Sequence, residues 1–168
     1  AGGGIRDRDA GVSGGVWGLT EGDALMVGGE AETVAIAQPI FDALRPVGDG
    51  GFVHAGPVGA GHFTKMIHNG IEYGMMQAYG EGYELMTASD LVPNPDAVIA
   101  SWREGTVIRP WLLDLMVRAL DADPGLAKIR GSAQDSAEGP WTIQAAIHPA
   151  VPPPVTPAAP SAPLPPPP

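Results

Sequence analysis

The sequence predicts a mixed fold, in which part of an α/β domain is followed by an all-α domain and a disordered proline-rich tail. Three features support this prediction. Residues 24–56 read as strand, helix and strand, residues 57–147 have helical spacing almost throughout, and residues 148–168 contain 11 of the 19 prolines. We therefore expect three regions, at residues 1–56, 57–147 and 148–168.

Composition and charge exclude several classes of function. Only nine Lys and Arg residues oppose 19 Asp and Glu residues, for a net charge of −10, so we expect no nucleic-acid partner. The chain has no cysteine, which excludes disulfides and zinc–thiolate sites, and we expect no metal ion. Without a long apolar run or a signal-peptide pattern, the sequence predicts a soluble, cytoplasmic protein with no membrane partner.

The N-terminal region contains a glycine-rich turn. The first ten residues show no convincing apolar strand, and residues 11–19 (GVSGGVWGL) read as a turn. Ser13, Gly14 and Gly15 would offer a hydroxyl and unobstructed backbone N–H groups to a carboxylate or phosphate oxygen. A plain turn without a ligand is the more frequent meaning of such a pattern.

The next segment has the pattern of a strand–helix–strand unit. Residues 24–29 (ALMVGG) predict a short buried strand, and residues 30–45 have helical spacing with Pro39 as a candidate kink. Residues 50–56 predict a second strand, in which His54 is expected to be packed or hydrogen-bonded rather than catalytic. Such a unit is the building block of an α/β domain.

The central segment, residues 56–76 with a continuation to 88, predicts a helix of about 25 residues. Five polar side chains fall on or beside one face at a period of 3.6 residues: Lys65, His68, Asn69, Glu72 and Tyr73. The opposite face is apolar and suited to packing: Phe63, Ile67 and Ile71. This face therefore predicts a functional site.

Further helices are expected towards the C-terminus. Asn94 and Pro95 suit a helix start, residues 107–120 carry an apolar stripe, and residues 138–147 read as a last helix with Trp141 near its start. The expected core residues of this region are large and apolar: Trp102, Trp111, Leu112, Leu115 and Met116. Arg109 suits bidentate phosphate binding, although an exposed Arg is commoner.

The tail, residues 148–168, predicts a polyproline-like, disordered segment with almost no formal charge. Its PPPVTP stretch is also loosely of the kind bound by SH3 and WW domains. Disorder without a partner is the simpler interpretation.

Taken in order, five segments resemble the decarboxylating 6-phosphogluconate dehydrogenases, especially their shorter bacterial form: DAGVSGGVWGLTEG, ALMVGG, HAGPVGAGHFTKMIHNGIEYGMMQAYGEG, WREGTVIRPWLLDL and EGPWTIQAAI. The resemblance covers about residues 9–147. Lys65 followed by Asn69 is shared with the wider β-hydroxyacid dehydrogenase group, whereas KMIHNGIEYG is more diagnostic. The resemblance implies the C-terminal remnant of a Rossmann-type domain followed by the family's all-α domain.

The resemblance also implies roles for the site residues in the oxidative decarboxylation of 6-phosphogluconate to ribulose 5-phosphate and CO2, with NADP or NAD as acceptor. Lys65 matches the family's base, which takes the C3 hydroxyl proton, and Glu72 matches its acid, which protonates C1 after CO2 leaves. The remaining matches bind substrate: His68 and Asn69 as orienting groups, Ser13, Gly14 and Gly15 at the carboxylate, and Tyr73 and Arg109 at the phosphate. An intrahelical ion pair between Lys65 and Glu72 is excluded by their spacing of seven residues.

The chain also departs from the family pattern. The glycine fingerprint that holds the cofactor pyrophosphate is expected upstream and is missing, so we expect the main cofactor site to be absent. Pro110 and Pro140 stand where we expect a small polar and a basic residue, and the proline-rich tail stands where the family has a segment that enters a neighbouring subunit. We therefore expect an incomplete chain, such as a truncated gene fragment with a frame change near His148.

Two other functions are compatible with the sequence. One is another β-hydroxyacid dehydrogenase, acting for example on 3-hydroxyisobutyrate, but that branch does not need His68, Glu72 and Tyr73. The other is a catalytically inactive helical domain that only oligomerises, because the family buries its all-α part against a partner subunit. We expect a homo-oligomer, a dimer or larger, in either case.

Overall fold

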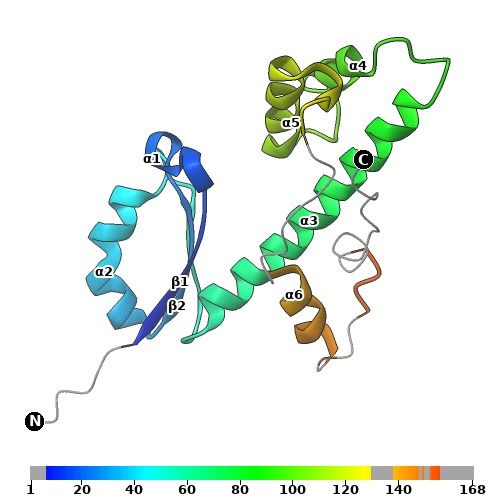
Figure 1. Ribbon diagram of the computed structural model, residues 1–168. Helices are drawn as coiled ribbons and strands as arrows, with labels where there is room; N and C mark the ends of the chain where they lie inside the picture. Colours follow the sequence, from blue (N-terminus) through cyan, green and yellow to red (C-terminus); the bar gives the residue numbers. More distant parts are fainter. Residues whose placement is uncertain (1–6, 130–137, 148, 150–151, 156–168) are drawn as a thin grey trace, which may run out of the picture. The chain divides into compact units, whose positions relative to one another are not determined.

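The computed structural model describes residues 7–129, 138–147, 149 and 152–155 (Figure 1). The chain divides into two compact units, residues 1–69 and residues 70–168. Within the described residues, no helix is both long and apolar enough to cross a membrane.

The first unit is built on a three-stranded sheet in the order β1–β2–β3. Strand β2 (Ala24–Gly29) pairs in parallel with β3 (Phe52–Gly56), and helix α2 (Ala31–Leu44) makes the crossover between them. Helix α2 covers one face of the sheet (Figure 1). The predicted strand–helix–strand unit is therefore confirmed. Two parallel strands need a long crossover connection, and α2 provides it.

Strand β1 (Arg8–Ser13) was not predicted and pairs antiparallel with β2, with Ala10 opposite Val27. Its sequence, RDAGVS, mixes charged and small residues and lacks the apolar run that indicates a strand. The strand forms because hydrogen bonds to β2 satisfy its backbone N–H and C=O groups. The following segment, expected to be a simple turn, forms a short 3₁₀ helix, η1 (Gly15–Trp17), and helix α1 (Gly18–Glu21).

The core of the first unit lies between the sheet and α2. Its buried apolar residues come from β2 and α2: Leu25, Val27, Val34, Ala37 and Phe41. Phe41 stacks on Phe52 of β3 with ring centroids 5.4 Å apart. His54 Nε2 lies 2.7 Å from the carbonyl oxygen of Gly29, so this histidine is hydrogen-bonded within the fold as expected.

Helix α3 (Ala60–Thr87, 28 residues) belongs to the first unit up to Asn69 and to the second unit from Gly70. Its length confirms the predicted long helix. The apolar side chains predicted to pack against protein are largely exposed in this structure: Phe63 at 51%, Ile67 at 37% and Ile71 at 56%.

The second unit continues with three further α-helices in the part of the chain that the structure describes: α4 (Pro95–Ser101), α5 (Trp111–Ala122) and α6 (Glu138–Ile147). A 3₁₀ turn, η2 (Pro124–Leu126), follows α5. Asn94 begins α4 as predicted, because its Oδ1 accepts a hydrogen bond of 3.0 Å from the backbone N–H of Ala97.

The core of the second unit differs from the expected one. Its buried residues are one from α4 and three from α5: Ile99, Leu113, Val117 and Leu120. The three α5 residues follow an i, i+4, i+7 spacing that defines one helix face. Trp111 begins the helix off this face and is 42% exposed, whereas Trp102 and Met116 pack against the core. Leu112 and Leu115 are only half-buried.

Most of the predicted disordered tail, residues 148, 150–151 and 156–168, lies outside the described residues. The domain boundaries predicted at residues 56 and 147 stay predictions.

Candidate active site

Four of the predicted site residues come together in the first unit, where the end of β1 meets α3. Lys65 Nζ donates a short hydrogen bond to Asn69 Oδ1 and lies 3.3 Å from His68 Nδ1. Ser13 Oγ lies 3.4 Å from His68 Nε2, within hydrogen-bonding distance. A hydroxyl, an imidazole, an amide and an amine thus form one connected cluster.

This cluster depends on a close approach of α3 to the sheet. A Cβ atom on Gly11 would overlap the side chain of Lys65 and approach the carbonyl oxygen of Gly61 to 2.7 Å, closer than a Cβ atom can lie to an oxygen. A Cβ atom on Gly61 would similarly overlap the backbone of Met26 and crowd Asp9. Because both positions are glycine, the helix lies directly against β1 and β2, and Lys65 is held beside the strand that ends at Ser13.

Asp9 holds the N-terminus of α3 in this position. Its carboxylate accepts backbone hydrogen bonds from Gly59 at 2.5 Å and His62 at 2.6 Å, and its side chain is only 8% exposed. Burial raises the pKa of the Asp9 carboxyl, but backbone hydrogen bonds from His62, Gly59 and Gly61 and the charge of His62 together lower that pKa below its ordinary value. Negative charge at a helix N-terminus is also favoured by the helix dipole.

The glycine turn follows directly after Ser13. Gly14 has an extended φ of 173°, and Gly15 has a φ of 57°, in the left-handed region that favours glycine. Cβ atoms on Gly14 and Gly18 would overlap the carboxylate of Asp23, so the turn packs closely on this side chain. Gly15 faces open space on the side where a Cβ atom would point.

The other predicted site residues belong to the second unit. Glu72 and Tyr73 follow Lys65 by seven and eight residues along α3. Arg109 lies in the loop before α5, is half-exposed, and places Nη2 3.7 Å from Glu104 Oε1.

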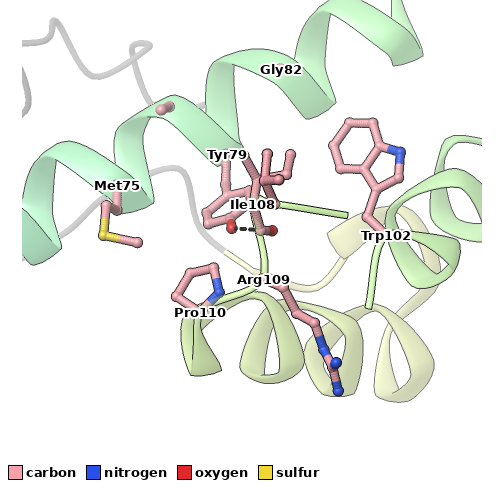
Figure 2. Close-up of a pocket in the computed structure, with 9 residues that line it drawn as sticks. Met75, Tyr79, Gly82, Trp102, Ile108, Arg109 and Pro110 are labelled. Carbon is pink, nitrogen blue, oxygen red and sulfur yellow. Dashed lines mark hydrogen bonds between the residues drawn. The ribbon is translucent and has the colours of Figure 1, made fainter. Parts of the chain in front are cut away.

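A cavity in the second unit was not predicted. It has a volume of about 610 Å³, and its lining is mainly apolar: Met75, Ala78, Tyr79, Gly82, Trp102, Val107, Ile108, Arg109 and Pro110 (Figure 2). Tyr79 Oη donates a hydrogen bond of 2.9 Å to the carbonyl oxygen of Ile108. The guanidinium of Arg109 points away from Tyr79 (Figure 2). The lining residues come from α3, from Trp102 and from the loop at residues 107–110. Helical or strand periodicity describes single segments, so it could not reveal that these three lie together.

The β2–α2 turn is the place where a parallel strand–helix unit could hold a dinucleotide pyrophosphate, and its residues do not fit. Glu30 stands at the N-cap of α2 and Glu32 lies in the first turn, where two carboxylates would repel phosphate. Across the described part of the chain, no group of three or more His, Asp or Glu residues could hold a metal ion.

Comparison with known proteins defines the class of protein first. Residues 2–48 match the model for the NAD binding domain of 6-phosphogluconate dehydrogenase, in agreement with the α/β fold of the first unit. Residues 61–162, more than half of the chain, match the model for the 6-phosphogluconate dehydrogenase C-terminal domain. The chain therefore belongs to the 6-phosphogluconate dehydrogenase family.

Individual relatives agree with this assignment. The chain is 44% identical over 144 residues to "Putative 6-phosphogluconate dehydrogenase YqeC" of Bacillus subtilis, with 86% of this chain and 48% of the relative covered. It is 40% identical over 145 residues to the NAD(+)-dependent, decarboxylating 6-phosphogluconate dehydrogenase of Haloferax volcanii, with the same two shares covered. The chain thus spans about half the length of these relatives.

Among solved structures, the chain is similar to Plasmodium falciparum 6-phosphogluconate dehydrogenase, which was determined in its apo form and in complex with NADP+ and with 6-phosphogluconate. The TM-score is 0.79 at 29% identity, over 90% of this chain and 34% of the other. The fold of this chain is therefore similar to about a third of that enzyme.

Proposed function

We propose that the whole protein to which this chain belongs oxidatively decarboxylates 6-phosphogluconate to ribulose 5-phosphate and CO2. The observation that carries the proposal is the cluster around Lys65, in which the amine contacts both Asn69 and His68. Membership of the 6-phosphogluconate dehydrogenase family and the names of the two curated relatives support the same reaction.

In this proposal Lys65 is the base and Glu72 is the acid. Lys65, once deprotonated, accepts the proton of the substrate's C3 hydroxyl during oxidation at C3. Asn69 keeps the lysine amine in place by accepting its hydrogen bond, and His68 lies between that amine and Ser13. After CO2 leaves, Glu72 donates the proton that C1 of the enediol needs.

The remaining contacts bind the two ends of the substrate. Ser13, Gly14 and Gly15 hold its carboxylate, because a hydroxyl and the backbone N–H groups of a glycine turn suit an anion. Tyr73 and Arg109 take the phosphate, for which a guanidinium is well suited.

NAD or NADP is the proposed oxidant, as named for the Haloferax and Plasmodium relatives. Because the β2–α2 turn does not fit a pyrophosphate, we place the main cofactor contacts outside the residues described here. The proposal further includes a cytoplasmic homo-oligomer with regions at residues 1–56, 57–147 and 148–168.

The chain contains only two lysines, Lys65 and Lys128. Replacing each in turn therefore distinguishes a catalytic role of Lys65 from the general effect of removing one positive charge. In a protein completed with the segments of the Haloferax relative that this chain does not span, Lys65→Met should lower kcat by about 10²–10⁴-fold, the usual contribution of a general base. Reduced nicotinamide is followed by absorbance with 6-phosphogluconate as substrate.

Lys128→Met is the matched control, because Lys128 is exposed and lies far along the sequence from the cluster. It should leave kcat within about twofold, as expected of a surface position. Equal activity of the Lys65→Met and Lys128→Met proteins would contradict the role of Lys65. Turnover of 3-hydroxyisobutyrate in place of 6-phosphogluconate would contradict the proposed substrate.

A further inference from the structure

The apolar cavity of the second unit has no role in the proposed reaction beyond the proximity of Arg109. One wall is the face of α3 that carries Met75, Ala78 and Tyr79, and the other is formed by Trp102 and residues 107–110 (Figure 2). Val107 is fully exposed at this site, and Ile108 is 48% exposed. Large apolar side chains left exposed around a groove indicate a binding surface.

The tail of the same chain has the chemistry to fill such a groove. From Pro154 to Pro166, a proline recurs at every third position: Pro154, Pro157, Pro160, Pro163 and Pro166. A polyproline II helix has three residues per turn, so in that conformation these prolines would share one edge. Residues 156–168 contain no charged side chain, which suits a mainly apolar groove, and proline-rich segments bind grooves lined by aromatic residues such as Tyr79 and Trp102.

The tail also starts beside the correct helix. A Cβ atom on Gly74 would lie 3.5 Å from Cγ1 of Val155, so Val155 lies next to α3 one residue before the first groove residue, Met75. From Gly74 to Gly82 the helix rises about 12 Å. In a polyproline II conformation, the 13 residues from 156 to 168 would span about 40 Å. The tail is therefore long enough to follow the groove from end to end.

We propose that residues 156–168 bind in the apolar groove of their own chain, with the repeated prolines against Tyr79 and Trp102. Because the tail is attached at Val155, next to the groove, even a weak affinity is enough to keep most grooves occupied. A short flexible link gives an effective concentration of about 1 mM, so a Kd of about 0.1 mM keeps about nine tenths of the grooves occupied. This proposal is independent of the proposed enzyme activity.

The absence of cysteine makes a specific test possible, because a single introduced thiol is the only labelling site. In the full chain, Ser161→Cys is labelled with a nitroxide, and the indole N–H signal of Trp102 is followed by NMR. We expect the label to broaden this signal, with its intensity at least about halved if most grooves are occupied. A Trp102 signal unaffected by the label would overturn the proposal.

Matched variants test whether the groove is responsible. Val107→Asp places a charge in the groove, and Val47→Asp places the same charge at another fully exposed valine in the first unit. The Trp102 signal should recover with Val107→Asp and stay broadened with Val47→Asp, and broadening that survives Val107→Asp would overturn the proposal. As a second variant, replacing Pro157, Pro160, Pro163 and Pro166 together with alanine should also restore the signal.

A mixture distinguishes binding within one chain from exchange between copies. Isotope-labelled chain without the nitroxide is mixed with nitroxide-labelled chain of natural isotope content. We expect no broadening of the Trp102 signal in this mixture. Broadening there would overturn binding within the chain and indicate that the tail enters the groove of a second copy.

Discussion

The Asp9 carboxylate joins strand β1 to the first turn of α3, the helix that carries the proposed base. Its two oxygens accept hydrogen bonds from backbone N–H groups of Gly59 and His62, which the helix itself leaves unsatisfied. Asp9 thus positions the helix that carries Lys65, although it is not itself a member of the Lys65 cluster. The sequence did not single it out, because its hydrogen-bond partners lie 50 and 53 residues away along the chain.

Replacing Asp9 tests this function through the pH dependence of stability. Because the pKa of Asp9 is lowered on folding, its contribution is present above the unfolded value of about 3.9 and is lost as the pH falls through the folded value. At neutral pH we expect Asp9→Asn to lower the free energy of unfolding by about 1–2 kcal/mol. The difference in unfolding free energy between Asp9→Asn and the unsubstituted chain should shrink below about pH 4. Urea unfolding across this pH range provides the measurement.

Asp49→Asn is the control for this experiment, since Asp49 is exposed in a loop of the same unit. Its effect should stay within about 0.5 kcal/mol at neutral pH. A pH-independent loss of stability with Asp9→Asn would contradict the role of the carboxylate charge.

Helix α3 shows which properties of an element follow from local sequence. Its length and its polar face could be predicted from spacing alone, since Lys65, His68 and Asn69 recur at helical intervals. The contact of this face with β1 could not, because β1 lacks an apolar pattern and forms by pairing with β2. Glycine at positions 11 and 61 makes the contact possible, but a glycine in a sequence does not reveal which backbone approaches it.

Gly11→Ala tests the close approach of α3 to the sheet. The added methyl group would overlap Lys65 and crowd the Gly61 carbonyl, so α3 or β1 must shift. We expect the free energy of unfolding to fall by about 1–3 kcal/mol, as for overpacking at other crowded sites. We also expect the NMR signals of His68 to shift because its distance to Ser13 changes.

Gly50→Ala is the matched control in the same unit, because a Cβ atom at Gly50 meets nothing within 4 Å. Its unfolding free energy should change by less than about 1 kcal/mol. If the two alanine variants were equally stable and left the His68 signals unchanged, the close approach of α3 would not be required for the fold.

At the scale of the whole molecule, the chain combines part of a nucleotide-binding α/β domain with part of a helical domain. It spans about half the length of its curated relatives. The Ser13 and Lys65 cluster is formed by residues of the first unit alone, whereas Glu72, Tyr73 and Arg109 belong to the second. The proposed activity therefore needs both units and a cofactor site that the β2–α2 turn does not supply.

Completion of the chain provides the test at this scale. We expect the isolated chain to give little or no reduced nicotinamide from 6-phosphogluconate with NAD or NADP. Joining it to the segments of the Haloferax relative that it does not span should restore turnover, because those segments would supply the missing cofactor contacts. A folded, completed protein without turnover would contradict the enzyme function and favour a helical domain that only oligomerises.

The sequence by itself determined the β2–α2–β3 unit, the long α3 helix and the Asn94 cap, because each depends on spacing or composition within one segment. It also indicated the family, through the resemblance of five segments taken in order. It also predicted the side chains of the Lys65 cluster. Only the tertiary structure decided that β1 exists, that Leu113, Val117 and Leu120 rather than Trp111 form the core beside α5, and that α3 and residues 107–110 enclose a cavity. These features arise from contacts between segments distant in sequence, whose pairing no local periodicity encodes.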